Sequence, residues 1–135
     1  MNDMLRIELL EKTKDKLSKI LLSEASDVYG TPPKYVVIKI GDAIELEYDF
    51  EFKTIDIAYL FDGKQLIQVK NDTEATLDTI SGMYFNQGSV RLGSAGNKAY
   101  LEYIVGPKFG RCFEYEIIEK EDGSHLGNEK IVWVS

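Results

Sequence analysis

Four carboxylates alternate with apolar residues in residues 43–52. They are the side chains of this sequence that are best suited to binding or catalytic chemistry. They are Glu45, Glu47, Asp49 and Glu51. Successive side chains of a strand point to opposite faces. The pattern therefore predicts a single strand with one apolar face and one face that carries a row of carboxylates. Four unpartnered charges are too costly to bury in a core, so we expect the acidic face to meet solvent or a partner.

Two kinds of chemistry are disfavoured by the spacing of these carboxylates. Calcium and magnesium prefer oxygen ligands, but alternate residues of a straight strand lie about 6–7 Å apart and do not converge on a point. Glycoside hydrolysis needs two carboxyl groups that face each other across a cleft, which neighbours on one strand face do not supply. Two readings remain: a solvated sheet face, or a face that attracts a cationic partner.

Few other residues could take part in catalysis or metal binding. Cys112 and His125 are the single cysteine and the single histidine, so they cannot build a zinc site alone. A Cys112–His125 pair is open to a nucleophilic role if the fold joins them. A cysteine within a strand is more often a small buried residue, and His125 is expected in a solvated loop. The glycine-rich segments 88–94 and 93–98 lack the Lys-Ser/Thr of a phosphate-binding loop. We therefore predict no catalytic residues, no metal and no cofactor.

The net charge of −7 in 135 residues is concentrated in two segments. Residues 42–62 hold seven acids and one lysine, and residues 114–122 hold five acids and one lysine. Such a surface repels the phosphates of nucleic acid and attracts basic proteins. The length predicts a single domain over residues 1–135. One cysteine and an N-terminus unlike a signal peptide favour the cytoplasm, and no apolar run reaches membrane-spanning length.

The elements that must position these residues can be read from periodicity. Residues 3–22 have the helical spacing of an amphipathic helix that can extend to residue 29, with Leu10 and Leu17 on its apolar face. We expect strands, with turns at 41–43 and 53–54, over residues 34–40, 43–52, 55–61, 64–69, 89–92, 99–105, 111–119 and 131–134. The segments between are read as a short helix within 71–88 and a polar loop over 121–128. The predicted fold is α+β: an N-terminal amphipathic helix packed on a mostly antiparallel, meander-type sheet of about 7–8 strands.

The leading functional hypothesis is a small acidic binding protein and not an enzyme. In size, charge and lack of a catalytic set, the chain resembles the small acidic immunity proteins that neutralise bacterial toxins. The resemblance implies that an acidic sheet face occludes the basic surface of a toxin, effector or nuclease. The predicted contact residues are Glu45, Glu47, Asp49, Glu51, Glu114 and Glu116. This hypothesis requires that the two acidic segments share one face.

Two alternatives come from other classes of protein. A helix clasped by a curved sheet can enclose a pocket, as in cystatin-like or NTF2-like folds, and the many tyrosines and Trp133 would then line a site for a small molecule or a hydrolytic reaction. The stronger expectation for these aromatic residues is that they fill the core. The third possibility is an assembly component that pairs with a copy of itself.

Overall fold

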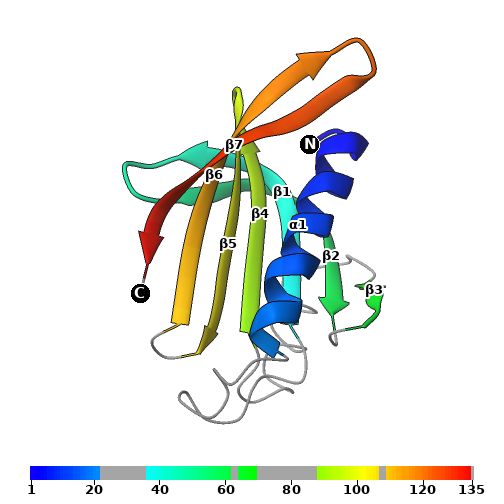
Figure 1. The fold of residues 1–135 in the computed structure, drawn as a ribbon, viewed down its shortest axis with the longest axis vertical. Coiled ribbons are helices and arrows are strands. Elements are labelled where there is room, and N and C mark those ends of the chain that lie inside the picture. The colour runs from blue at the N-terminus through cyan, green and yellow to red at the C-terminus, as the bar shows by residue number, and fades with distance from the viewer. Residues whose placement is uncertain (22–35, 62–63, 70–87, 107–108, 135) are drawn as a thin grey trace.

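The computed structural model describes residues 1–21, 36–61, 64–69, 88–106 and 109–134, which form one helix and a single seven-stranded sheet (Figure 1). The elements are α1 (Asp3–Leu21), β1 (Val36–Glu45), β2 (Phe50–Phe61), β3 (Leu66–Val69), β4 (Gly88–Ala95), β5 (Lys98–Gly106), β6 (Phe109–Lys120) and β7 (Gly123–Val134). The predicted α+β class, with an N-terminal helix and a mostly antiparallel sheet, is confirmed. No helix in these ranges is long and apolar enough to cross a membrane.

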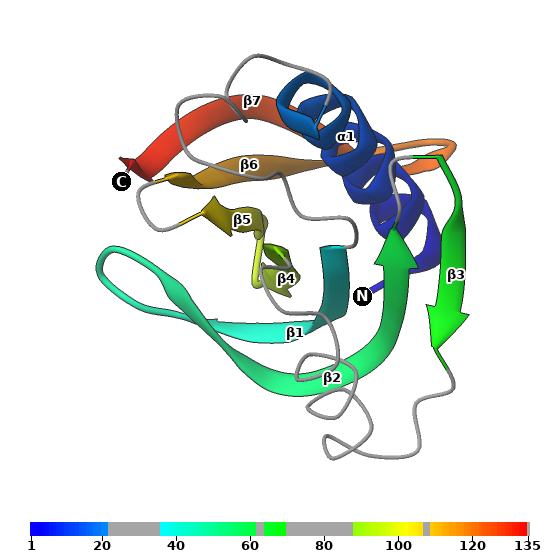
Figure 2. The same cartoon turned by 90° about the horizontal axis from the view of Figure 1, so that it is seen from below.

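The strand order is β3-β2-β1-β4-β5-β6-β7. Neighbours within β1–β3 and within β4–β7 are antiparallel, but β1 and β4 pair in parallel. The sheet is therefore two antiparallel runs joined side by side, and not one continuous meander. Figure 2 shows that the sheet curls strongly, so that α1 lies between its two edge strands, β3 and β7.

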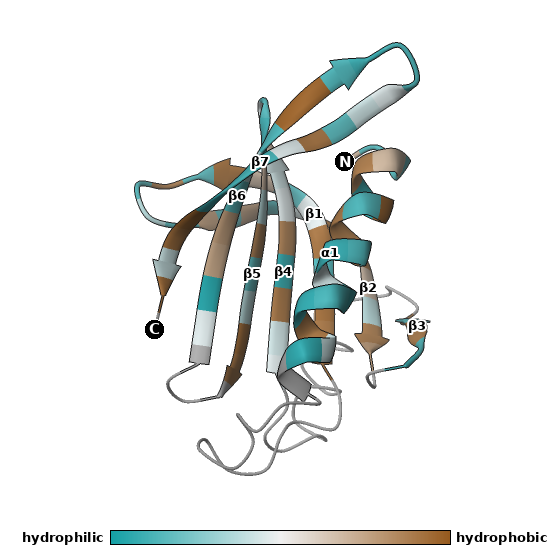
Figure 3. Cartoon of the chain, in the orientation of Figure 1, coloured by the Kyte–Doolittle hydropathy of each residue, from teal (hydrophilic) through white to brown (hydrophobic). Residues whose placement is uncertain are grey.

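The main core lies between α1 and the inner face of this curl. Leu9 and Leu17 of the helix are fully buried against inward-facing residues such as Ile38, Leu92 and Leu101. Hydrophilic and hydrophobic residues alternate along β4 in Figure 3, as expected for a strand whose two faces differ. The predicted burial of Leu10 and Leu17 is confirmed. Ile7 of the same helix is exposed.

The predicted strand over residues 43–52 is wrong. β1 continues past the expected turn at 41–43 and ends at Glu45, and β2 begins at Phe50 and runs through the expected turn at 53–54. Gly41 explains the first error. A Cβ on Gly41 would lie 1.7 Å from the carbonyl oxygen of Thr54, so this glycine permits a close strand contact at a bulge and does not form a turn.

The register follows from this bulge. Ile40 pairs with Ile57, and Lys39 faces Ala58. Residues 36–69 accordingly contribute three strands to the sheet and not four. The chain reverses at residues 46–49, where the backbone N–H of Leu46 donates to the carbonyl of Asp49 at 2.9 Å.

Two further predictions can be compared with the described residues. The polar loop expected over 121–128 is wrong, because β7 begins at Gly123 and forms a long hairpin with β6. The brief strand expected at 89–92 is longer, since β4 covers Gly88–Ala95. The helix expected within 71–88 lies outside the described residues apart from Gly88, as do the extension of the first helix to residue 29 and the connections between expected strands at 62–63 and 107–108.

Candidate functional site

The β1–β2 hairpin lies against the face of the sheet opposite α1. Tyr100 and Leu101 are neighbours in β5, so they point to opposite faces. Leu101 belongs to the main core, whereas Tyr100 belongs to a second cluster with Phe50 and Cys112. Phe50 is 0% exposed and stacks on Tyr100 with ring centroids 5.3 Å apart. A Cβ on Gly93 would lie 3.0 Å from the Phe50 ring, so glycine makes room for this contact.

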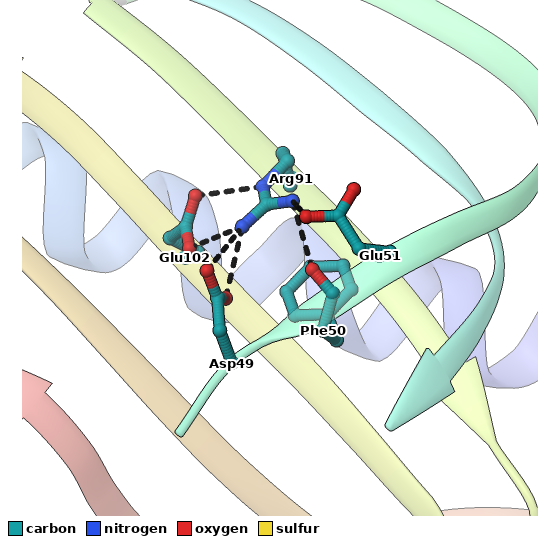
Figure 4. Close-up of polar contacts among 5 residues, drawn as sticks. All are labelled: Asp49, Phe50, Glu51, Arg91 and Glu102. Carbon is teal, nitrogen blue, oxygen red and sulfur yellow. Dashed lines mark hydrogen bonds and ion pairs between the residues drawn. The ribbon is translucent and has the colours of Figure 1, made fainter. Parts of the chain in front are cut away.

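A half-buried arginine fixes the hairpin in this position (Figure 4). Arg91 of β4 donates to both oxygens of the Asp49 carboxylate, at 2.9 and 3.0 Å, and to the carbonyl of Phe50 at 2.9 Å. Its Nε donates to Glu102 of β5 at 2.7 Å, and Glu51 forms a longer ion pair at 3.9 Å. The guanidinium also lies 4.5 Å from the centroid of the Phe50 ring. One side chain thus joins the hairpin to two strands of the sheet.

Burial determines the electrostatics of this cluster. Glu102 is 4% exposed, and burial raises the pKa of its carboxyl, an effect that Arg91 partly offsets. Burial opposes the charge of Arg91 as well, but Glu102 and Asp49 outweigh it, so the pKa of Arg91 is raised above its ordinary value. Arg91 and Glu102 therefore compensate each other's charge, and each offsets the cost of burying the other.

Cys112 adjoins the same cluster. Within the described ranges, Asp49, Glu102 and Cys112 place one ligand atom each within 4.8 Å of one another, a spacing that suits a metal ion. Arg91 already donates to both carboxylates. Burial raises the pKa of the Cys112 thiol to about 12, with Glu102 and Asp49 adding to the shift. A protonated thiol and two carboxylates bound to a guanidinium favour an ion-pair centre over a metal site.

A second ion cluster joins the two acidic segments. The Nζ of Lys98 lies 2.9 Å from Glu45 of β1 and 3.3 Å from Glu114 of β6. The hydroxyl of Tyr100 donates to Glu114 at 3.3 Å. Hydrogen bonds from Tyr100 and Lys98 lower the pKa of Glu45. Lys98 therefore brings Glu45 of the hairpin and Glu114 of β6 together on one surface.

The predicted contact residues are placed differently from a straight row. Asp49 and Glu51 meet Arg91, Glu45 and Glu114 meet Lys98, Glu47 is exposed in the turn, and Glu116 is exposed opposite Lys98 in the β5–β6 register. We call these six carboxylates the acidic surface.

Arg91 and Glu102, the residues that organise this surface, were missed by the sequence reasoning. A signal for them was present. Each is a single charged residue among strand residues that are apolar or small. The two residues are direct cross-strand partners in β4 and β5. Opposite charges that are isolated on neighbouring strands are a pattern typical of a buried ion pair.

His125 lies in β7 and not in a solvated loop. Its Nδ1 is 3.0 Å from Glu8 of α1, and its Nε2 is 2.7 Å from Asp122. The second oxygen of Glu8 accepts the backbone N–H of Leu126. His125 pairs with Ile118 of β6, whereas Cys112 lies six residues earlier on that strand, opposite Trp133. Six strand residues span about 20 Å, so a Cys112–His125 nucleophilic pair is excluded.

The contacts of His125 predict that the stabilisation of the contact between α1 and the β6–β7 hairpin depends on pH. Only the imidazolium can donate from both ring nitrogens, and Asp122 and Glu8 raise the pKa of His125. Because the folded-state pKa is raised, the stabilisation is complete below the unfolded value of about 6.5 and is lost as the pH rises through the folded-state pKa. We expect His125→Gln to lower the urea midpoint at about pH 5.5 and to have little effect at about pH 9. An equal effect at both pH values would contradict this role.

A hollow of about 450 Å³ lies where the start of α1 meets the sheet. Its wall includes Leu5, Ala43 and Ala95 together with the charged groups Lys53 and Glu119. The amino group of Met1 forms an ion pair with Asp42, another lining residue, at 3.0 Å. Among the residues that the structure describes, this hollow can be compared with the pocket of the small-molecule alternative. Ligand pockets are mostly apolar with a few convergent polar groups, and this lining of mixed charge does not match that description.

No family model, curated protein or solved structure matches this chain. The surface of the molecule is therefore the basis for a functional proposal.

Proposed function

We propose that this chain is a small acidic binding protein that neutralises a basic partner, in the manner of a toxin-neutralising immunity protein in the bacterial cytoplasm. The observation that carries the proposal is the Lys98 bridge, which brings Glu45 of the hairpin and Glu114 of β6 onto one surface. A continuous anionic patch attracts a cationic protein and steers its approach. Occlusion of a basic effector or nuclease site then follows from the bound position.

The balance of charges at the two ion clusters supports this proposal. Arg91 is surrounded by three carboxylates, those of Asp49, Glu51 and Glu102. Lys98 has two carboxylates around its ammonium group. Carboxylates outnumber cations at both clusters, so an approaching protein meets a net negative field.

Charge reversal at the exposed edge of the acidic surface tests the proposal. Glu47→Lys/Glu116→Lys leaves the ion pairs of Arg91 and Lys98 in place, so the fold should be retained. The control Asp15→Lys/Glu121→Lys adds the same charge at exposed positions on α1 and the β6–β7 turn. The tips of the β1–β2 and β6–β7 hairpins point to opposite sides of the molecule in Figures 1 and 2, so the β6–β7 turn lies away from the turn that carries Glu47.

The measurement is affinity capture from the source cells at low salt, followed by binding and activity assays with the purified partner. We expect a basic protein whose activity falls in the complex. Its Kd should increase by about tenfold with the surface variant, mostly through the association rate, and remain unchanged with the control. Equal weakening by both variants would contradict the assigned surface, and a partner that stays active in the complex would contradict neutralisation.

A further inference from the structure

The end of the β1–β2 hairpin exposes three large apolar side chains in succession. Ile44, Leu46 and Tyr48 are 53%, 46% and 69% exposed. They alternate with Glu45 and Glu47, which are exposed as well. We call residues 44–48 the hairpin tip. Large apolar groups that gather on a projecting segment without joining the core are typical of a contact site for another molecule.

The hairpin tip is held by the structure behind it. The Leu46–Asp49 backbone hydrogen bond closes the turn, and Asp49 is bound by Arg91 through both carboxylate oxygens. The next residue, Phe50, is fully buried. A preformed tip loses little conformational entropy when it binds. An exposed tyrosine on such a support has the properties of a binding anchor, since it offers a large rigid area and a polar hydroxyl.

The charges around the tip define the chemistry of its partner. Glu45, Glu47 and Glu51 surround the apolar side chains in sequence and are exposed. A cleft that receives them must be apolar at its centre and carry arginine or lysine at its rim. An anionic lipid surface would repel these carboxylates. A second copy of this chain has the same net charge of −7, which opposes self-association.

We propose that the hairpin tip inserts Tyr48, with Ile44 and Leu46 beside it, into an apolar cleft of the partner protein whose rim is basic. This inference rests on the proposed function, because it concerns the same partner. It adds a specific claim: the acidic surface steers the approach, and the apolar tip holds the complex together. The two contributions act on different rate constants, because charge mainly affects association and a buried anchor mainly affects dissociation.

The first experiment places the photo-crosslinking residue p-benzoylphenylalanine at position 48 of the full chain in the source cells. The same residue at position 121, in the β6–β7 turn, is the control. Crosslinked peptides are mapped by mass spectrometry onto the partner. We expect crosslinks from position 48 to apolar residues of one cleft flanked by arginine or lysine, and none to that cleft from position 121.

The second experiment measures binding kinetics with the purified partner at two salt concentrations. Tyr48→Ser should raise the dissociation rate by about tenfold or more, by a factor that is similar at both salt concentrations. Ile7→Ser, which removes an exposed apolar side chain from α1, should leave the rates unchanged. Both positions are exposed, so circular dichroism should show folded proteins.

The outcomes separate this inference from the proposed function. A basic partner whose affinity falls with Glu47→Lys/Glu116→Lys but not with Tyr48→Ser would overturn the tip insertion and leave the proposed function standing. Failure to find a basic partner would overturn both. Crosslinks from position 48 to a second copy of the chain or to lipid would overturn the insertion in favour of self-association or membrane contact.

Discussion

Arg91→Leu should lower the free energy of unfolding by about 3–5 kcal/mol. The substitution removes the guanidinium that compensates Glu102, and Glu102 is 4% exposed. An uncompensated buried carboxylate either takes up a proton or draws water into the cluster, and both cost free energy. The same change releases Asp49 and the carbonyl of Phe50, so the hairpin loses its anchor on the sheet.

The double variant Arg91→Leu/Glu102→Leu separates the charge effect from the loss of packing. With both ions replaced by apolar groups, no buried charge remains, and we expect much of the lost stability to return. The measurement is urea unfolding of the wild type, both single variants and the double variant. Costs that simply add in the double variant would contradict a coupled buried pair. The pH adds a second readout, since the raised pKa of Glu102 means that the Arg91→Leu defect should lessen as the pH falls.

Phe50→Ala should also lower the free energy of unfolding by about 3–5 kcal/mol, because it removes a fully buried ring from the second cluster, which contains Tyr100 and Cys112. The ring contacts Tyr100 and Arg91, and the glycine at position 93 leaves no side chain to fill the space. Trp133, the single tryptophan, packs against this cluster. Its fluorescence should therefore report the change in the folded state as well as the shift in the unfolding midpoint.

Phe50→Leu is the matched control for this prediction. Leucine keeps most of the apolar volume, so the cost should be markedly smaller than that of alanine. If alanine and leucine were equally costly, the ring contacts with Tyr100 and Arg91 would matter more than burial. If alanine cost less than about 1 kcal/mol, the hairpin would not depend on this buried ring.

Periodicity along the sequence was sufficient to predict some helices and strands and not others. The helix begins at Asp3, where the sequence predicted its start, because helical periodicity depends on neighbours along the chain. Residues 43–52 alternate as a strand does, yet the chain reverses within them at 46–49. Alternation cannot distinguish one strand from two arms of a hairpin joined by a short turn. Gly41 was read as a turn because glycine serves in turns and in close strand contacts alike.

By itself, the sequence determined the α+β class, the antiparallel character of most of the sheet and the acidic segments that carry the candidate surface. These depend on composition and on short-range spacing, which are present in every conformation of the chain. Only the tertiary structure decided that Glu45 and Glu114 share a surface, that Arg91 and Glu102 anchor the hairpin, and that Tyr48 is exposed at its tip. Each of these joins or separates residues through strand register, and register is set by long-range pairing that no local pattern contains.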